Sequence, residues 1–467
     1  MKISMPAGAR HIIRQLNTNG FEAYIVGGCV RDCLLGKMPN DWDITTNAKP
    51  NQVKSIFSHT VDTGIEHGTV TVLVDKNIVA EDAGAQMVAD GKSAHYAYAY
   101  EVTTYRVDGV YEDHRRPKDV TFTASLKEDL KRRDFTINAM AYNDEQGVID
   151  IFGGISDLKD GIIRCVGVAS ERFDEDALRI LRAVRFAAQL GFSIDENTQD
   201  AMKKQARFLA QISAERIQVE LTKLIMSPHP DMLEKAYRLG ITQIILPEFD
   251  TMMETEQRNI HHKYSVGWHT IHVMEHVPPT MIARYAALLH DVGKPDCKST
   301  DENGIDHFYG HAEKSKQLAN TILRRLKLDN HTIQAVQTLI LNHDYGISGN
   351  IGIKAFRRFL GRLGPENFED FILLRKADIA GQSDYRLMEK QKFVSQLETM
   401  YETVINEKHA LSTADLAISG KDLIALGMKP GRELGEILHE LLEHVLDVPE
   451  DNTAKHLLQM ARQRMNK

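Results

Sequence analysis

Two aspartates, Asp41 and Asp43, are separated by one residue in a segment whose composition is typical of a β-strand. Side chains alternate between the two faces of a strand, so both carboxylates should point the same way and be able to share divalent cations. Enzymes that transfer nucleotidyl groups use such pairs, with one ion activating the attacking hydroxyl and another stabilising the leaving pyrophosphate. A solvated surface pair is the alternative, so the neighbouring segments must decide.

A glycine pair upstream favours the catalytic interpretation. Gly27 and Gly28 end an apolar segment predicted to be a strand and open a segment predicted to be a helix, with Arg31 on its first turn. Glycine lets the backbone approach a phosphate, and the N-terminus of a helix favours negative charge. These residues predict a phosphate-binding turn that serves the aspartate pair.

A second charged set follows a helical spacing. Asp176, Arg179, Arg182 and Arg185 are three residues apart, so on one continuous helix they would form a shallow spiral ~13 Å long. Ionised Asp only accepts hydrogen bonds and Arg only donates them. Cytosine and adenine present an amino donor beside a ring-nitrogen acceptor, whereas guanine and uracil present a carbonyl beside an N–H. Asp176 and Arg179 would therefore accept CTP and ATP and reject GTP and UTP; a salt-bridged exposed face is the alternative.

The elements that position these residues differ along the chain. Up to about residue 150, short segments rich in β-branched and aromatic residues alternate with helical ones, which predicts a mixed α/β unit. From residue 170 onward, apolar residues recur with the helical period, so the remainder should be mostly helical. We expect strands at 21–26, 42–46, 69–74 and 101–105, with a hairpin or an insertion at 81–100.

Composition limits the class of protein. At 467 residues the chain should hold two to four domains, and 42% apolar with 26% charged residues is typical of a globular protein. The apolar runs are too short to span a membrane. The four cysteines form no CxxC pair and the N-terminus has no secretory core, so we expect a cytoplasmic protein with reduced thiols. A net charge of −8 argues against a protein that is covered with nucleic acid, but it allows local basic patches that could bind RNA.

Several segments resemble the motifs of class II tRNA nucleotidyltransferases, the family of CCA-adding enzymes and bacterial poly(A) polymerases. The glycine pair lies in Val-Gly-Gly-Cys-Val-Arg-Asp at 26–32, and the aspartate pair in Asp-Trp-Asp-Ile at 41–44. Residues 101–117 resemble the segment with the family's flexible loop, and 132–141 match its next motif almost residue for residue. Glu-Asp-Ala-Leu-Arg at 175–179 fits the family's EDxxR motif.

The resemblance implies roles for the residues in these motifs. Asp41 and Asp43 would be the catalytic carboxylates that bind Mg²⁺, and Glu101 would be a third carboxylate or a structural residue. Asp176 and Arg179 would form an amino-acid template for the incoming base. The nucleotide-binding set is Gly28, Arg31 and Arg133 on the triphosphate, with Asp176, Arg179, Arg182 and Arg185; Asp134 and Asn138 arrange the sugar and the motif, and 214–220 support the neck.

The middle of the chain is rich in histidine: ten of the twenty histidines fall within 261–343. This region resembles an HD phosphohydrolase domain, in which separated helices give His, His-Asp and a late Asp to one metal. Imidazole with carboxylate suits a transition metal such as Ni²⁺, Co²⁺ or Mn²⁺ better than Mg²⁺ alone. A degenerate HD fold, whose histidines only satisfy packing, is the alternative. The implied ligands are His269, His290, Asp291 and Asp378, with His311 and His343 for a second ion or the substrate phosphate.

The resemblance also implies the architecture, an α+β protein. A polymerase-β-like head with a mixed sheet and helices would be followed by an all-α neck, body, HD domain and tail. The expected bounds are 1–152 for the head, 153–225 for the neck, 226–400 for the body with the HD domain at about 261–380, and 401–467 for the tail.

The implied activity is the template-independent addition of C, C and A to tRNA 3′ ends from CTP and ATP, by a monomer or a homodimer. A poly(A) polymerase, an enzyme adding only CC or only A, and a protein that is mainly an HD phosphohydrolase acting on RNA 3′ ends are the alternatives. Arg115, Arg116 and Pro117 in the loop segment favour CC addition. The stretch at 81–100 departs from the family's usually short connection.

Overall fold

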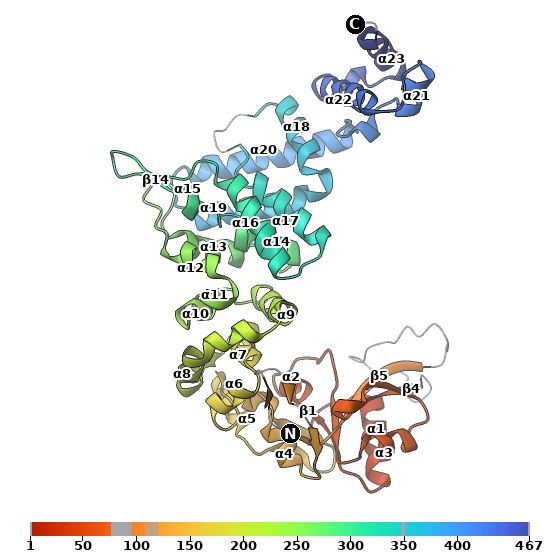
Figure 1. The fold of residues 1–467 in the computed structure, drawn as a ribbon, viewed down its shortest axis with the longest axis vertical. Coiled ribbons are helices and arrows are strands. Elements are labelled where there is room, and N and C mark those ends of the chain that lie inside the picture. The colour runs from red at the N-terminus through yellow and green to blue at the C-terminus, as the bar shows by residue number, and fades with distance from the viewer. Residues whose placement is uncertain are drawn as a thin grey trace. The chain divides into compact units, whose positions relative to one another are not determined.

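The computed structural model describes residues 2–75, 96–108, 111–112, 116–117, 120–346 and 351–465. The chain forms two compact units, residues 1–247 and 248–467. The first, drawn from red to green in Figure 1, contains the large sheet; the second, drawn from green to blue, is mostly helical. Among the described helices, none is long and apolar enough to cross a membrane. The finer domain bounds given above stay predictions.

A seven-stranded mixed sheet forms the centre of the N-terminal unit. The strand order is β11-β10-β1-β2-β5-β4-β3, and neighbouring strands are antiparallel except for the parallel pair β2 and β5. The predicted mixed sheet is therefore confirmed. The strands are β1 Ala23–Val26, β2 Ile44–Thr46, β3 Thr60–Gly64, β4 Thr69–Asp75, β5 Tyr96–Thr104, β10 Met140–Asn143 and β11 Gly147–Asp150.

Burial explains how the sheet is held. Strand β1 lies between β10 and β2, and all four of its residues are buried. Helix α1 (Ala7–Thr18) buries Ala9, Ile12, Ile13 and Leu16, which recur at helical spacing on one face. Helix α3 (Pro50–Ile56) lies beside α1 (Figure 1). The other helices of this part are α2 Gly28–Leu34, α4 Leu126–Lys131 and α5 Gly154–Asp160.

The start of strand β5 differs from the prediction, which placed a hairpin or an insertion at 81–100. The strand already begins at Tyr96, because the alternating Tyr and Ala residues of 96–100 pair with β4 from Val72 to Asp75. Residues 81–95 lie outside the described residues, as does Arg115 of the loop segment. The nearby short strands are β6 Arg106–Asp108, β7 Tyr111–Glu112, β8 Arg116–Pro117 and β9 Val120–Phe122.

Helices complete the N-terminal unit after the sheet. The prediction of one continuous helix through Asp176 and the arginines is wrong: α6 (Ala169–Glu175) ends just before Asp176, and α7 (Leu178–Leu190) starts just after it. Asp176 has an extended backbone, and its carboxylate accepts the Leu178 N–H, which supports the start of a new helix. The remaining helices are α8 Glu196–Gln205, α9 Ala214–Ile225, α10 Met232–Arg238 and α11 Thr242–Ile245.

The C-terminal unit is mostly helical, as predicted. Helices α13, α14 and α19 pack against one another, and α16 packs against α17. The one described hairpin of this unit joins β14 (Ser299–Thr300) to β15 (Asp306–His307). The helices are α13 Val266–His276, α14 Met281–Leu289, α15 Lys294–Cys297, α16 His311–Arg325, α17 Asn330–Asn342, α18 Ile353–Leu363, α19 Phe368–Gly381, α20 Leu387–Asn406, α21 Gly420–Ala425, α22 Arg432–Asp447 and α23 Ala454–Met465, with α12 Pro247–Glu254 at the junction of the units.

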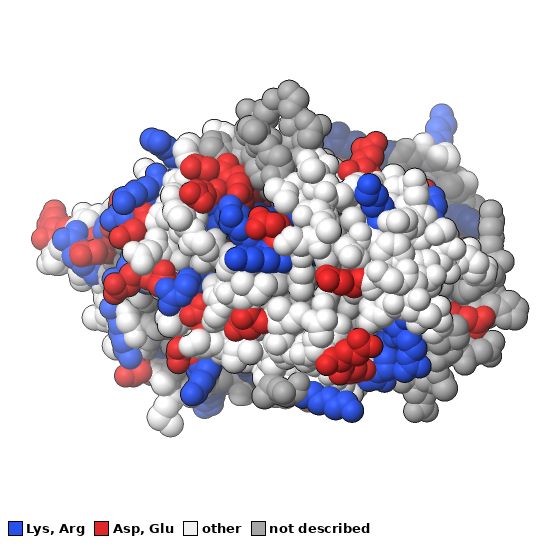
Figure 2. Space-filling model, turned by 90° about the horizontal axis from the view of Figure 1, so that it is seen from below, with Lys and Arg blue, Asp and Glu red and all other residues white. Residues whose placement is uncertain are grey.

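Charge is mixed on the face drawn in Figure 2. Lys and Arg side chains are interspersed there with Asp and Glu and are separated by uncharged residues. The described side chains of this face form no continuous basic field, in keeping with the net charge of −8.

Candidate active site

The aspartate pair lies at the start of β2. The strand itself begins at Ile44, so the prediction that Asp41 and Asp43 stand within it is wrong by a few residues. The extended backbone nevertheless reaches Asp43, whose carbonyl accepts the Val26 N–H at 3.0 Å. Trp42 is buried, whereas Asp41 and Asp43 are exposed. Both aspartates are therefore on the open side of this segment.

Glu101 stands beside this pair. In the parallel register of β2 and β5, Ile44 pairs with Val102, which puts Asp43 next to Glu101. Burial raises the pKa of Glu101, and the Asp43 and Asp41 charges raise it further. Asp43 is exposed as a residue, but its carboxyl is partly buried, and this burial raises its pKa. The Arg133 charge opposes this shift and the Asp41 charge adds to it. Close carboxylates that disfavour one another's ionisation are a donor set that fits a divalent cation.

The glycine turn lies against Arg133. Gly27 has φ +83°, a conformation that favours glycine, and a Cβ added there would lie 2.9 Å from Arg133 Nη1. Arg133 Nη2 also lies 3.5 Å from Asp129 Oδ2, a fully buried carboxylate that Arg132 binds at 2.7 Å. Gly28 begins α2, and a Cβ there would lie 3.7 Å from Arg31 Nη2. The turn thus holds two predicted triphosphate-binding arginines close to the backbone.

A hydrogen-bonded chain runs from α2 to α7. Arg31 Nη1 donates to Asn138 Oδ1 at 2.7 Å, and Asn138 Nδ2 donates to Asp134 Oδ1 at 3.2 Å. Arg182 Nε donates to Asp134 Oδ2 at 2.9 Å. Burial alone would raise the pKa of Asp134, but Arg182 and the other donors lower it to about 2. Asp134 and Asn138 therefore tie together arginines that come from different elements.

Three predicted nucleotide-binding arginines gather around Phe186. The guanidinium carbons of Arg185, Arg31 and Arg182 lie 3.6, 5.1 and 5.4 Å from its ring centroid. The face of an aromatic ring attracts cations. Buried Glu220 on α9 binds Arg185 Nε at 2.7 Å. Phe186 and the contact of Glu220 were missed by the sequence prediction, and the arginine spacing was the only signal near them.

The predicted template residues have different partners in the structure. Asp176 Oδ2 binds Arg216 Nη2 at 2.7 Å. Arg179 forms an ion pair with Glu175, and its Nη2 donates to the Arg132 carbonyl at 2.8 Å. The sequence prediction assigned Arg216 only to neck support, since its partner lies 40 positions away along the chain.

A separate cluster lies in the C-terminal unit. His269 Nε2 lies 3.3 Å from His290 Nε2, 3.1 Å from Asp378 Oδ1 and 3.6 Å from Asp291 Oδ2. All four side chains are buried. The structure thus brings together the four residues of the predicted HD site. Neighbouring His272 on the same helix instead binds Glu275 at 2.9 Å, so the histidine spacing along α13 supplies only His269 to this cluster.

Asp291 also reaches a second pair of histidines. Its Oδ1 lies 3.5 Å from His311 Nε2 and 3.6 Å from His343 Nε2, and these two nitrogens are 3.3 Å apart. Burial would raise the pKa of Asp291, but His290 and Lys294 hold it well below its usual range. A cavity of about 770 Å³ opens here, lined by Asp291, Lys294, Phe308, His311, Arg375 and Asp378 among others. One carboxylate therefore stands between two groups of imidazoles at a cavity wall.

Family models match three parts of the chain. A model described as the poly A polymerase head domain matches residues 23–164. One described as "Probable RNA and SrmB- binding site of polymerase A" matches 191–253, and tRNA nucleotidyltransferase domain 2 matches 299–461.

Named relatives extend over the whole chain. The CCA-adding enzyme of Lactiplantibacillus plantarum is 36% identical over 457 residues, which are 97% of this chain and 95% of that protein. The crystal structure of the Bacillus stearothermophilus CCA-adding enzyme in complex with CTP has a TM-score of 0.70 and 29% identity, and it covers 99% of both chains. The Thermotoga maritima CCA-adding enzyme complexed with tRNA, at 22% identity and a TM-score of 0.56, shares the fold. Because the similarity continues from the head through the helical C-terminal part, the chain belongs to the CCA-adding enzyme family of tRNA nucleotidyltransferases.

Proposed function

We propose that this protein adds C, C and A to the 3′ ends of tRNA from CTP and ATP. The observation that carries the proposal is the cluster of Asp41, Asp43 and Glu101, which faces open surface beside Arg133 and the glycine turn. Family membership supplies the reaction class, and the relatives named above are all CCA-adding enzymes, one of them solved with CTP.

In this reaction the 3′-hydroxyl of the tRNA attacks the α-phosphate, and pyrophosphate leaves. Asp41 and Asp43 would hold Mg²⁺, which when bound activates the hydroxyl and stabilises the charge on the leaving group. Arg133, against Gly27, and Arg31, oriented by Asn138, supply cations for the triphosphate. The chain's own residues thus bind and orient the nucleotide while the carboxylates provide the metal site.

Base selection falls to Asp176 and Arg179 in this proposal. Asp176 accepts from the exocyclic amine of C or A, and Arg179 donates to the adjacent ring nitrogen. Arg182 and Arg185, placed around Phe186, would contact the nucleotide beside them. These four residues form ion pairs with Glu175, Asp134, Glu220 and Arg216, and a bound nucleotide would compete with some of these contacts.

The activity is tested with tRNA that lacks its CCA end, incubated with CTP, with ATP, and with both. CTP alone should add two residues, and both nucleotides together should add three. A long ATP-dependent tail would indicate a poly(A) polymerase. Arrest after CC in the presence of both nucleotides, or addition of A only to tRNA that already ends in CC, would indicate a partial enzyme.

A second candidate function is a metal-dependent phosphohydrolase in the C-terminal unit. The observation that favours it is the orientation of the four histidine rings. The Nδ1 atoms of His269, His290, His311 and His343 contact backbone carbonyls at 2.7–3.1 Å. Each ring therefore turns its Nε2 atom toward the neighbouring carboxylates and imidazoles.

This orientation fits metal binding, because a metal-binding histidine typically donates its other ring N–H to a backbone carbonyl or a carboxylate. In each histidine pair, the two Nε2 atoms face one another at 3.3 Å, so both could contact a shared cation. His269, His290, Asp291 and Asp378 would hold one ion and His311 and His343, with Asp291, a second. Ni²⁺, Co²⁺ or Mn²⁺ suits these ligands. Lys294 and Arg375 line the cavity and would bind a substrate phosphate.

The hydrolysis is tested with phosphomonoesters and 2′,3′-cyclic phosphates in the presence of each of these ions. Replacing His290 and Asp291 together by alanine should stop hydrolysis without changing CCA addition. Absence of bound transition metal together with absence of hydrolysis under every ion would favour the degenerate HD fold.

A further inference from the structure

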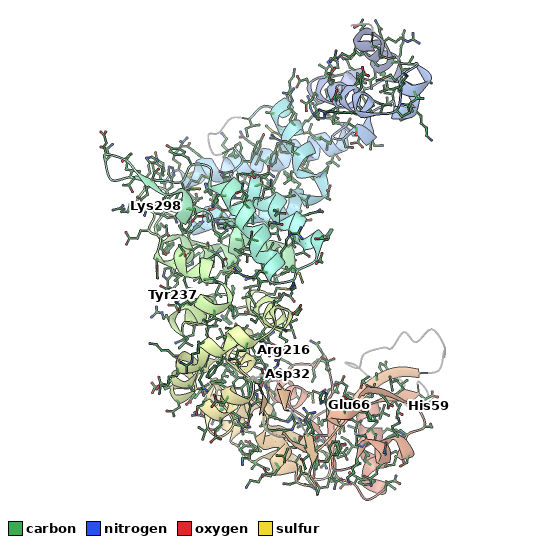
Figure 3. All side chains as sticks on the ribbon, viewed as in Figure 1. Asp32, His59, Glu66, Arg216, Tyr237 and Lys298 are labelled. Atoms are coloured by element: carbon green, nitrogen blue, oxygen red, sulfur yellow. The ribbon has the colours of Figure 1, made fainter. Side chains whose placement is uncertain are left out.

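Asp176, the proposed base-reading carboxylate, is held by an arginine from outside its own motif. Arg216, labelled in Figure 3, lies on α9 and places Nη2 2.7 Å from Asp176 Oδ2. The other carboxylate oxygen, Oδ1, accepts the Leu178 N–H at 3.1 Å. The two oxygens of Asp176 are therefore fixed by donors from two different helices.

This arrangement leaves Asp176 able to bind a base. A carboxylate can accept about four hydrogen bonds, so each oxygen of Asp176 has room for another donor. Its side chain is 17% exposed, so part of it faces open space. A planar group anchored at one oxygen can still turn, whereas anchors at both oxygens fix its plane. Reading one edge of a base requires such a fixed plane.

Helix α9 complements the charges of the whole base-reading set. Arg216 and Glu220 are four residues apart on it and so share one helix face. Arg216 presents a cation to Asp176, while Glu220 presents an anion to Arg185 at 2.7 Å and to Arg182 at 3.6 Å. Helix α9 thus supplies a donor to the Asp176 carboxylate and an acceptor to the Arg182 and Arg185 guanidinium groups.

We propose that Arg216 is a positioning residue for base selection, which fixes the Asp176 carboxylate so that it accepts the exocyclic amine of C or A. The inference rests on the proposed CCA addition and on Asp176 as the base reader. Arg216 itself does not contact the base in this account; it acts through Asp176. Loss of Arg216 should therefore weaken discrimination between bases more than it weakens nucleotide binding.

The test compares Arg216→Gln, Arg216→Lys and Asp176→Asn with the wild type. The measurement is kcat/KM for CTP and UTP on tRNA lacking CCA, and for ATP and GTP on tRNA ending in CC, with the thermal midpoint of each variant. Arg216→Gln should lower the CTP-over-UTP preference by about fivefold or more, the lower end of what one base contact contributes. Arg216→Lys should restore part of it, because lysine keeps the charge but not the guanidinium geometry. Exposed Arg207→Gln is the matched control and should keep the wild-type ratio.

Asp176→Asn separates failure of this inference from failure of the proposed base reading. Asparagine supports a helix start as well as aspartate does, so the bond to Leu178 survives while the carboxylate is lost. If Asp176→Asn keeps the preference for CTP, the base is read elsewhere and the premise fails. If Asp176→Asn loses the preference and Arg216→Gln keeps it, the role of Arg216 is overturned. An equal slowing with all four nucleotides in Arg216→Gln would also overturn it, since that is the effect of a merely structural residue.

Discussion

The Cβ position of Gly27 lies 2.9 Å from Nη1 of Arg133, so the guanidinium occupies the space that any larger residue would fill. The two residues are 106 positions apart, and their contact joins the glycine turn to the motif at 132–141. The glycine therefore has two reasons to be there, its positive φ of +83° and the arginine that lies against it.

Gly27→Ala should displace Arg133 and raise the KM for CTP and ATP, with a loss in kcat/KM of up to about 100-fold, as a shift of about 1 Å in a catalytic site can cause. Gly36→Ala is the matched control, because Gly36 has φ +72° but nothing within 4 Å of its Cβ position. Both variants place alanine at a positive φ, so the thermal midpoint of each is measured beside its KM to show that the compared proteins are folded. Equal KM values in the two variants would show that Arg133 does not bind the triphosphate.

Asp43→Asn should abolish nucleotide addition and yet stabilise the metal-free protein. Loss of a metal ligand should remove several kcal/mol of transition-state stabilisation, a rate loss of at least about 100-fold. The pKa of Asp43 is raised in the folded state, so its ionisation opposes folding, and this cost grows as the pH rises from the unfolded value near 3.8 through the folded pKa. At pH 7 without metal, the variant should therefore melt above the wild type.

Mg²⁺ should reverse that order. The wild type should gain thermal stability on adding Mg²⁺, because a cation that binds only the folded state stabilises it, and Asp43→Asn should gain less. Melting curves in chelator and in Mg²⁺ measure both effects. A variant that melts below the wild type in chelator would contradict the electrostatic argument.

Asp134→Asn should make the free energy of unfolding less dependent on pH in the acid range. The folded pKa of Asp134 is lowered to about 2 from an ordinary value of 3.8, so its stabilisation is complete above pH 4 and is lost as the pH falls toward 2. The shift corresponds to roughly 2 kcal/mol at neutral pH. Urea unfolding between pH 2.5 and 7 measures it: the difference between wild type and variant should shrink as the pH falls. A constant difference would mean that packing, not the ion pair with Arg182, stabilises this position.

Local spacing was enough to predict the turn and the segment that carry the candidate catalytic residues. The glycine turn and the aspartate pair each lie within a few consecutive residues, so the local sequence is enough to recognise them. The turn lies directly between β1 and α2 along the chain. The predicted strand began at residue 42, whereas β2 begins at Ile44; before it, Asp43 continues the pairing with β1 through the bond of its carbonyl to the Val26 N–H. The early start of β5 depends on pairing with β4, a long-range contact that alternation alone does not reveal.

The break between α6 and α7, where the proposed base-reading residues lie, could not be predicted in the same way. The Glu-Asp-Ala-Leu-Arg sequence is compatible with a helix throughout. The helix breaks at Asp176 because its carboxylate accepts the Leu178 N–H at the start of a new helix. The Asp176 carboxylate accepts the Leu178 N–H and also binds Arg216. The bond to Arg216 forms only when α9 is folded against this segment. Sequence spacing on a helix says which residues share a face, but not which distant cation will reach them.

The buried histidine and aspartate cluster around Asp291 gives the last prediction. Its ligands come from separate helices, and Asp291 lies between the His269–His290 pair and the His311–His343 pair. We expect about two transition-metal ions per chain in the wild type, and fewer once either group is broken. His311→Ala should lose one of the two ions, because the group around His269 keeps its own ligands. His290→Ala combined with Asp291→Ala should lose both.

Elemental analysis after dialysis against Mn²⁺, Ni²⁺ or Co²⁺ measures the number of bound ions in each variant. His331→Ala, at an exposed histidine, is the control. Chelation should also lower the thermal midpoint of the wild type, because a cation that binds only the folded cluster stabilises it and is then removed. The midpoint of the double variant should not respond to chelator, since its cluster can no longer bind an ion. If the metal content of His311→Ala equals that of the wild type, the second pair of histidines binds no ion. Direct contact with a substrate phosphate, the alternative that the sequence offered, would then be the role left for these histidines, which line the same cavity as Lys294.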